Sequence, residues 1–403
     1  MKALLRSSLV AAALCCASTP CFANGFLIYD LSGEAIGRAS AVSADASEPA
    51  AVWFNPAALA YMDGVNVSAG GVFITARSDF EARGGGAETS SKRGNFVLPA
   101  LFGTGKIGDR VALGLGVYSA FGIGVSWPES WQGRENAISA SLQTLSINPT
   151  VAVKLTDAWS LAAGFDAVWS SVDFKNGLPS IVGGDVRLVG DAWGFGFNAA
   201  ALYRAIPDRL HFALTYRSRV KLDYDGRADF SPHNPDFART LPDQPGSAVI
   251  TLPDVLTAGV MVRPSRDFKL GVDANVELWS TYKRIPIDFS SAPDRTLRPE
   301  GHDSFTLRGG VDFEPNQRGF HARAGVIFDR SAIPARGLGP ALPDSDRVDL
   351  TFGAGYGNGA FKADLGYMLV VFLPADAHGG TESPEGRYHT LAHLVGLTLG
   401  AHF

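Results

Sequence analysis

The eight histidines and the serines are the residues of this chain that could act as catalytic bases and nucleophiles. No Gly-x-Ser-x-Gly element, which would hold a nucleophilic serine on a strand-to-helix turn, occurs in the sequence. The histidines are scattered, and most have no neighbouring acid that suggests a triad. His389 and His393 would share one strand face, but four residues along a strand span about 13 Å, too far for one metal ion. The sequence therefore predicts no enzyme, no catalytic residue, no metal site and no cofactor.

Residues 1–23 have the layout of an export signal. Lys2 and Arg6 give a positive start, Leu9 to Leu14 form an apolar middle, and Ala23 ends a stretch of small residues. The apolar part is too short to cross a bilayer as a helix. All three cysteines fall in this signal, so we expect no disulfide in the mature chain: Cys15, Cys16 and Cys21.

The charge balance argues against nucleic acid as a partner. Without Lys2 and Arg6, 33 of the 35 basic residues remain against 40 acidic ones, a net charge of −7. After residue 23 no run of eighteen apolar residues occurs, which excludes transmembrane helices. An exported chain of this kind is either a secreted β-protein or an outer-membrane barrel.

Apolar and polar residues alternate with the period of a β-strand in many segments. In residues 269–278, leucine, valine and alanine occupy one face, and lysine, aspartate, asparagine and glutamate occupy the other with a glycine. Residues 304–313 and 361–367 repeat the plan. The segments run about ten to sixteen residues, long enough to cross a bilayer at a tilt, with one face toward lipid and one toward the lumen.

The pattern predicts a 14-stranded antiparallel transmembrane β-barrel over residues 64–403. Short and long links alternate, as in outer-membrane barrels, and an even strand number places both termini in the periplasm. The alternating strand that ends on Phe403 resembles the signal read by the barrel-assembly machinery. The long links are expected at residues 77–93, 122–136, 175–188, 225–246, 289–302, 330–346 and 374–387.

Residues 24–63 precede the first expected strand and predict a short helical hatch inside the lumen. Ser32 with Glu34 is a helix-start signal, and Pro56 would start or stop a helix. A disordered tail is the alternative, but disordered tails rarely contain large apolar residues such as Trp53 and Phe54.

The whole mature chain resembles the FadL/TodX family of outer-membrane transporters for long-chain fatty acids and aromatic hydrocarbons. Eight short matches occur in the family's order: Gly25-Phe26, Gly37-Arg38-Ala39, Asn55-Pro56-Ala57, Val67 to Gly70, Trp193 to Gly196 with Asn198, Leu214 to Ser218, Asp329 to Pro334, and Pro343 to Arg347. The resemblance implies a hatch whose gating residues include Gly37, Arg38, Asn55, Pro56 and Ala57.

The resemblance also implies a transport route. An extracellular groove captures the apolar ligand, an internal pocket receives it, and a kink in the third strand releases it sideways through the wall. Here the matching strand is glycine-rich, and glycine permits a bulge. The expected opening is therefore at Ser119, Phe121 and Gly122. A merely glycine-rich strand end is the alternative.

The family places its groove on the third and fourth outer loops. Apolar residues that are unexpected on a wet surface occur in both loops here: Leu178, Ile181 and Val182, and Phe230 and Phe237. Lys175 or Arg187 could replace the family's basic ligand for a carboxylate. A missing carboxylate clamp would favour a neutral hydrocarbon.

The sequence thus predicts a monomeric channel in the outer membrane of a Gram-negative bacterium, in contact with lipid and lipopolysaccharide. Long-chain fatty acids are its first expected ligand, followed by toluene-type hydrocarbons. A general porin, an adhesin and an outer-membrane enzyme remain as alternatives from other classes.

Overall fold

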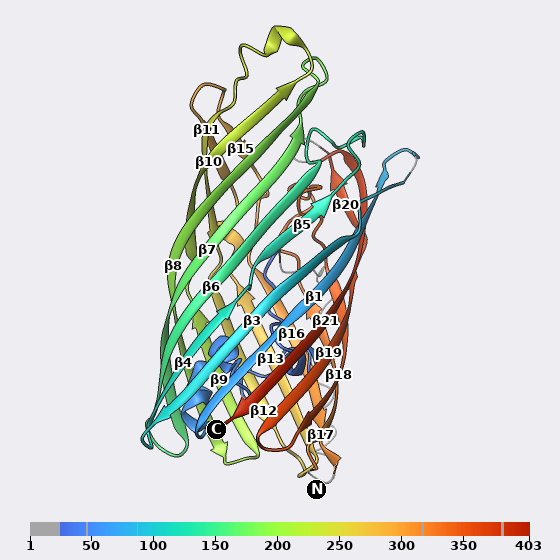
Figure 1. The fold of residues 1–403 in the computed structure, drawn as a ribbon. Helices are drawn as coiled ribbons and strands as arrows, with labels where there is room; N and C mark the ends of the chain where they lie inside the picture. Colours follow the sequence, from blue (N-terminus) through green and yellow to red (C-terminus); the bar gives the residue numbers. More distant parts are fainter. Residues whose placement is uncertain (1–24, 46, 87, 316–317, 380–382) are drawn as a thin grey trace, which may run out of the picture.

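The computed structural model describes residues 25–403 except 46, 87, 316–317 and 380–382. The predicted export signal lies outside these residues. Strands form one closed antiparallel barrel that surrounds the N-terminal segment (Figure 1). Within the described ranges, no helix combines the length and the apolar character needed to cross a membrane.

Fourteen strands build the wall, as the alternation predicts. Eight are continuous: β1 (Val65–Ala82), β3 (Gly94–Ile107), β6 (Ser139–Lys154), β7 (Trp159–Gly177), β8 (Gly184–Ile206), β17 (Phe320–Asp329), β18 (Arg347–Gly357) and β21 (Glu385–His402). Six consist of two segments: β4 (Val111–Tyr118) with β5 (Gly122–Ser126), β9 (Leu210–Arg217) with β10 (Val220–Pro232), β11 (Gln244–Leu252) with β12 (Val255–Val262), β13 (Phe268–Glu277) with β14 (Ile285–Phe289), β15 (Arg295–Leu297) with β16 (Ser304–Phe313), and β19 (Phe361–Phe372) with β20 (Ala375–His378). The short β2 (Thr89–Ser90) is added beside β1.

The barrel closes between its first and last strands. β1 pairs with β21 from Asn66 opposite His402 to Ala82 opposite Gly386, and with β3 on its other side. Closure joins the two edges that an open sheet would expose, which a membrane interior would not tolerate.

Strand β13 is apolar outside and polar inside, the reverse of a strand in a soluble protein. Along β13, Leu270 and Val272 are 42% and 52% exposed, while Asp273, Asn275 and Glu277 are at most 1% exposed. The apolar exposed face fits a lipid environment, and the buried polar face lines the lumen.

Six of the seven predicted long loops are shorter than expected because their flanking strands continue, and only 330–346 keeps its predicted bounds. Two of the six bear on the predicted groove. β7 and β8 remain paired to Gly177 opposite Asp185, which leaves only residues 178–183 as a turn. β10 and β11 likewise leave residues 233–243, in which the 3-10 helix η2 (Pro235–Phe237) lies. These strands extend well beyond the rest of the wall at the end opposite the C-terminus (Figure 1).

The N-terminal segment forms three short helices inside the barrel, near the end with short turns (Figure 1). They are α2 (Gly33–Gly37), α3 (Ala51–Phe54) and the 3-10 helix η1 (Pro56–Tyr61). The Ser32 hydroxyl caps α2 by accepting from the Ala35 amide, and Pro56 takes the first position of η1. Ser32 and Pro56, which the sequence predicts as helix-start residues, therefore lie at helix starts in the structure. We call residues 25–63 the hatch.

Glycines in the wall let the hatch backbone approach it closely. A Cβ added at Gly310 of β16 would lie 2.1 Å from the Arg38 carbonyl oxygen. One added at Gly271 of β13 would lie 2.1 Å from the Ala41 carbonyl oxygen. The hatch thus packs backbone against backbone, and a side chain at either position would displace it.

Replacing Gly310 with valine should loosen the hatch without preventing barrel formation. Overpacking of this kind costs about 1–3 kcal/mol, and here the hatch is the part that can move. Single-channel recordings in planar bilayers should show higher conductance for Gly310→Val than for the unmodified protein. Gly309→Val is the matched control, because a Cβ at Gly309 meets nothing within 4 Å. Equal conductance of the two variants would contradict the role given to Gly310.

Candidate functional site

The third spanning strand is broken into β4 and β5 by a bulge. The β4–β6 ladder ends with Tyr118 opposite Ser146, and the β5–β6 ladder begins with Gly122 opposite Gln143. Three residues, 119–121, therefore face two, 144–145, which bends the strand. The Thr144 hydroxyl accepts from the Phe121 amide at 3.1 Å and donates to the Phe121 carbonyl at 2.8 Å. This hydroxyl replaces the missing ladder bonds.

The bend separates β5 from β3. β3 pairs with β4 only from Ala100 to Ile107, and its first six residues, 94–99, pair with β1 alone. Among the described residues no ladder joins β3 to β5. The ring of Phe96 lies over Gly124, where a Cβ would come within 2.0 Å of the ring. The wall is thus filled by side chains here rather than closed by backbone hydrogen bonds.

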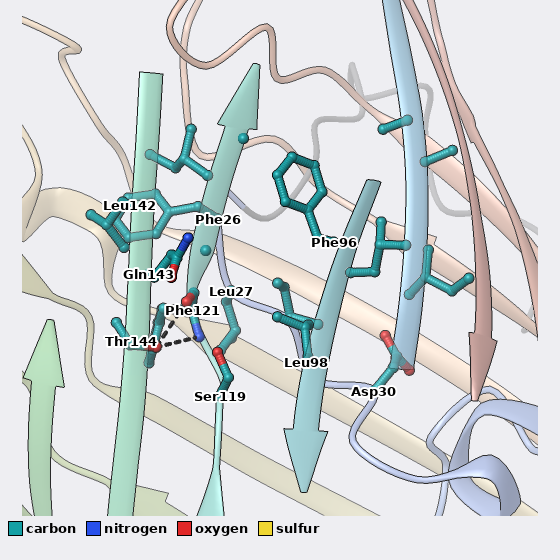
Figure 2. A pocket seen from close by; sticks show the side chains of 18 of the residues that line it. Phe26, Leu27, Asp30, Phe96, Leu98, Ser119, Phe121, Leu142, Gln143 and Thr144 are labelled. Carbon is teal, nitrogen blue, oxygen red and sulfur yellow. Dashed lines mark hydrogen bonds between the residues drawn. The ribbon is translucent and has the colours of Figure 1, made fainter. Parts of the chain in front are cut away.

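A cavity of about 550 Å³ lies at this separation (Figure 2). Its lining includes all three residues predicted for the opening, Ser119, Phe121 and Gly122. Strand alternation divides the other lining residues between two faces. Lumen-facing members are Ile74, Leu98, Met368, Val370, Ala392 and Leu394. Outward-facing members are Asn95, Val97, Pro99, Gln143, Leu145 and Trp169. The cavity therefore reaches both sides of the wall.

The start of the hatch lies against the bend. Leu27 forms a β-bridge with Phe121, and the Gly122 amide donates to the Phe26 carbonyl at 3.1 Å. The Phe26 ring packs on Trp279 and Tyr282, with centroids 4.7 and 5.3 Å away. Trp279 belongs to the 3-10 helix η3 (Trp279–Thr281) between β13 and β14. A movement of the hatch at Phe26 would therefore change the cavity.

The hatch residues singled out from the sequence are buried and have structural partners. Asn55 accepts from the Ala57 amide and donates to the Ser43 carbonyl at 2.7 Å. Gly37 approaches the wall so closely that a Cβ would lie 2.9 Å from the Gly353 Cα. Arg38 is fully buried and pairs with Asp45 at 2.8 Å and Glu34 at 3.4 Å.

The ion pairs of Arg38 extend into a network that joins the hatch to the wall. Lys269 of β13 pairs with Asp45, and Lys362 of β19 pairs with Glu34. Arg323 of β17 pairs with Asp312 at 3.3 Å and Asp364 at 2.6 Å. Four carboxylates and four cations balance, and His321 also contacts Asp312.

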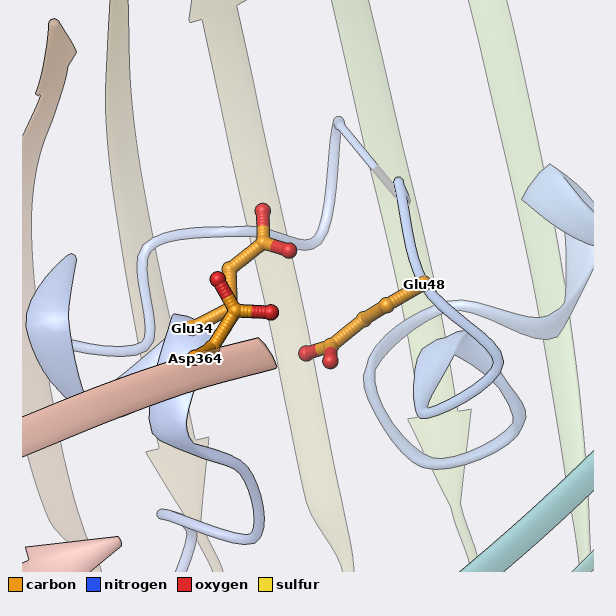
Figure 3. Close-up of side chains that lie close together, drawn as sticks. All are labelled: Glu34, Glu48 and Asp364. Atoms are coloured by element: carbon orange, nitrogen blue, oxygen red, sulfur yellow. The ribbon is translucent and has the colours of Figure 1, made fainter. Parts of the chain in front are cut away.

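Glu48 is an additional carboxyl group beside this network (Figure 3). Single oxygens of Glu48, Glu34 and Asp364 all lie within 4.8 Å of one another, a spacing that a metal ion could use. Lys362 and Arg323 already neutralise the other two, so no cation is required. The Ser32 hydroxyl donates to Glu48. Burial raises the pKa of the Glu48 carboxyl to about 8, and the Glu34 carboxylate adds to the effect.

The predicted groove residues divide into two groups. Leu178, Val182, Phe230 and Phe237 meet in one apolar cluster between the long strands. Ile181 is 76% exposed and stays outside the cluster. A second apolar pocket lies nearby, between β7, β8, β10, β11 and β14, and shares Leu188 and Phe289 with the cluster's edge. Of the residues predicted for the groove, Phe230 thus lies on a strand, β10, in a segment for which the sequence predicts a loop.

Lys175 and Arg187, the predicted carboxylate ligands, do not line either pocket. Lys175 pairs with Glu129 at 3.0 Å and Asp185 at 3.3 Å, and the Arg187 guanidinium makes two hydrogen bonds to Asp173. The basic residue that lines the large cavity is Arg347, which the sequence singles out only as part of a family match. No sequence pattern singles out Thr144, Asp30 or Asp349 as cavity residues. The spacing of residues along the chain does not reveal which lumen-facing side chains meet at the bend.

Stability of the hatch should decrease as pH rises. The native state holds the Glu48 proton above the ordinary glutamate pKa of 4.5, so its contribution is present below 4.5 and lost as pH rises through about 8. Channel openings in planar bilayers should become more frequent between pH 6 and 9, and Glu48→Gln should remove this dependence. Glu385→Gln, at an exposed ion pair with Arg83 at the start of β21, should keep it. Unchanged pH dependence in Glu48→Gln would contradict the account.

Comparisons with known proteins agree with this architecture. The family model described as Outer membrane protein transport protein (OMPP1/FadL/TodX) matches residues 14–403. A long-chain fatty acid transport protein of Escherichia coli O6:H1 is 26% identical, over 90% of this chain and 89% of that protein. Outer membrane protein P1 of Haemophilus influenzae is 23% identical, over 98% and 99%.

Solved structures show the same fold. A FadL homologue of Pseudomonas aeruginosa superposes with a TM-score of 0.85 at 19% identity, covering 94% of this chain and 100% of that one. The toluene transporter TodX of P. putida superposes with a TM-score of 0.75 at 19% identity, covering 94% and 99%. The family match spans nearly the whole sequence, and the barrel places the chain in the outer membrane of a Gram-negative bacterium. The chain belongs to the OMPP1/FadL/TodX family of outer membrane transport proteins.

Proposed function

We propose that the protein is a passive outer-membrane channel for long-chain fatty acids and related hydrophobic compounds. The ligand is captured by the outer apolar pocket and the cluster at Leu178, Val182, Phe230 and Phe237. It then enters the large cavity and leaves sideways between β3 and β5 into the membrane. The observation that carries this proposal is the cavity whose lining reaches both faces of the wall at the bulge.

A sideways exit suits an apolar ligand on energetic grounds. Each CH₂ group that stays out of water is favourable by about 0.8 kcal/mol, so an aqueous route through the lumen would carry a large penalty for a long chain. The hatch also fills the lumen on the side of the short turns with buried residues such as Val52 and Phe54. Release into the bilayer avoids both obstacles.

Gly37, Arg38, Asn55, Pro56 and Ala57 hold the hatch in the closed state in this proposal. Their caps, close approaches and ion pairs tie it to the wall. The channel acts as a monomer with lipopolysaccharide and lipid at its outer face. The barrel-assembly machinery recognises the final strand, β21, together with Phe403, which follows it and is 75% exposed.

Aromatic hydrocarbons are the second candidate ligand. The family includes TodX, a toluene transporter in P. putida, and Lys175 and Arg187 are both engaged by carboxylates away from the cavity. A neutral ligand needs no basic partner, so these contacts favour it over an ionised one.

A tryptophan at Gly122 should block uptake while leaving the barrel folded. A Cβ at Gly122 would be at ordinary contact distance, 3.5 Å, from Ile28 and Leu142, so the larger side chain would extend into the cavity without a backbone clash. Uptake of radiolabelled oleate by cells that make the variant should fall at least about tenfold. Gly103→Trp, at a β3 position where a Cβ meets nothing within 4 Å, should transport normally. Normal uptake by Gly122→Trp would rule out the lateral exit.

Replacing Thr144 with valine should disturb the bend by removing both of its side-chain hydrogen bonds to Phe121. A buried amide left without a partner costs about 1–3 kcal/mol, enough to let β5 shift toward β3 and narrow the cavity. Oleate uptake should decrease, with unchanged heat-modifiable mobility on gels. The control is Thr150→Val, because the Thr150 hydroxyl on the same strand has no hydrogen-bond partner among the described residues. Equal uptake by both variants would contradict the bracing role.

A further inference from the structure

The ionisable residues of the large cavity come from the hatch and β18. Of all the lining residues, only Asp30, Arg347 and Asp349 carry charge. Asp30 lies near Leu98 and the bend (Figure 2), and Arg347 and Asp349 face the lumen from β18. A ligand whose apolar chain fills the rest of the cavity would therefore place its polar group beside two carboxyl groups and one guanidinium.

The single cation among these residues is already engaged. Arg347 pairs with Asp329 at 2.5 Å and with Asp349 at 3.6 Å, and its guanidinium lies over the Phe372 ring. Arg308, which also lies near Asp30, stacks on the Tyr29 ring at 4.3 Å and does not line the cavity. The Arg347 Nε has no hydrogen-bond partner among the described residues, but the charge of the guanidinium is already matched by two carboxyl groups. A carboxylate ligand would thus meet an excess of acidic groups in this cavity. Burial of an unpaired charge is strongly unfavourable.

The same residues offer hydrogen-bond acceptors. Asp349 is 1% exposed, and its Oδ1 has no hydrogen-bond partner among the described residues. Asp30 uses its Oδ1 to accept from the Ser40 hydroxyl at 2.5 Å. A buried acceptor without a donor is costly, and a ligand hydroxyl would satisfy it. A hydroxyl can also accept, so it suits either protonation state of the aspartate.

We infer that the cavity selects hydrophobic ligands whose polar end is an uncharged hydroxyl, as in a long-chain alcohol, a phenol or a protonated fatty acid. Asp349 accepts the hydroxyl hydrogen bond, and the carboxylate form of a fatty acid binds more weakly than the neutral ligand. This inference rests on the proposed function, because it takes the cavity as the ligand site. It narrows the ligand class by charge rather than by chain length.

The test compares two brominated ligands of equal length in binding to the full mature protein in detergent micelles at pH 8. Dibromostearyl alcohol is neutral, and dibromostearate is ionised. Bromine quenches tryptophan fluorescence, and Trp169 lines the cavity. The saturable part of the quenching, absent in Trp169→Phe, should report an affinity at least about tenfold higher for the alcohol.

Asp349→Asn should reduce this preference to within about threefold, because it removes one acidic group from the cavity and leaves Asp329 as the ion-pair partner of Arg347. The matched control Asp173→Asn, on the outer face at the Arg187 pair, should keep the full preference. Tighter binding of dibromostearate by the unmodified protein would overturn the inference and leave the transport function standing. Failure of both ligands to bind would overturn the proposed function itself. An unchanged preference in a folded Asp349→Asn variant would overturn the role of Asp349.

Discussion

A β-barrel in a bilayer depends on satisfying its backbone hydrogen bonds within the wall, because lipid offers no partners. This barrel leaves the ladder between β3 and β5 unmade among its described residues and compensates with side chains. Thr144 replaces two ladder bonds at the bulge, and the hatch contributes its own backbone at Phe26 and Leu27. The gap in the ladder is therefore stabilised by two neighbouring segments, β6 and the hatch.

The hatch likewise depends on contacts with the wall. It is too small to fold alone, so its stability comes from the wall: close backbone contacts at glycines and a balanced network of buried ion pairs. A network of buried ion pairs adds little to the net free energy of folding, but removing one partner of a pair is costly. This cost favours two discrete states of the hatch, held and released, over gradual loosening. The hatch also forms backbone hydrogen bonds with the bulge in the third spanning strand. The position of the hatch and the packing of side chains between β3 and β5 therefore stabilise each other.

Much of the fold could be predicted from the sequence, since period-two alternation fixes which face of each strand meets lipid. The fourteen strands, the start of α2 at Ser32 and the start of η1 at Pro56 all follow from local patterns. Glycines and the family resemblance predict an opening at Ser119 to Gly122, where the structure has the bulge between β4 and β5. Local patterns could not show that β7 and β8 extend to Gly177 and Gly184, because charged residues such as Lys175 and Arg187 fit either a loop or an outer strand end. They also could not reveal that Arg347, Asp349 and Asp30 converge, since these residues are far apart in the chain and meet only after closure.

The route of the ligand is the central claim, and photo-cross-linking tests it most directly. A long-chain alcohol that carries a diazirine would be bound to the reconstituted protein and irradiated, and its adducts would be mapped by mass spectrometry. The account predicts adducts on lumen-facing Met368 and Leu394, on Phe96 at the separation, and on outward-facing Val97 and Leu145. Adducts that run instead through the hatch, at Val52, Phe54 and Leu59, with none at Val97 or Leu145, would contradict it.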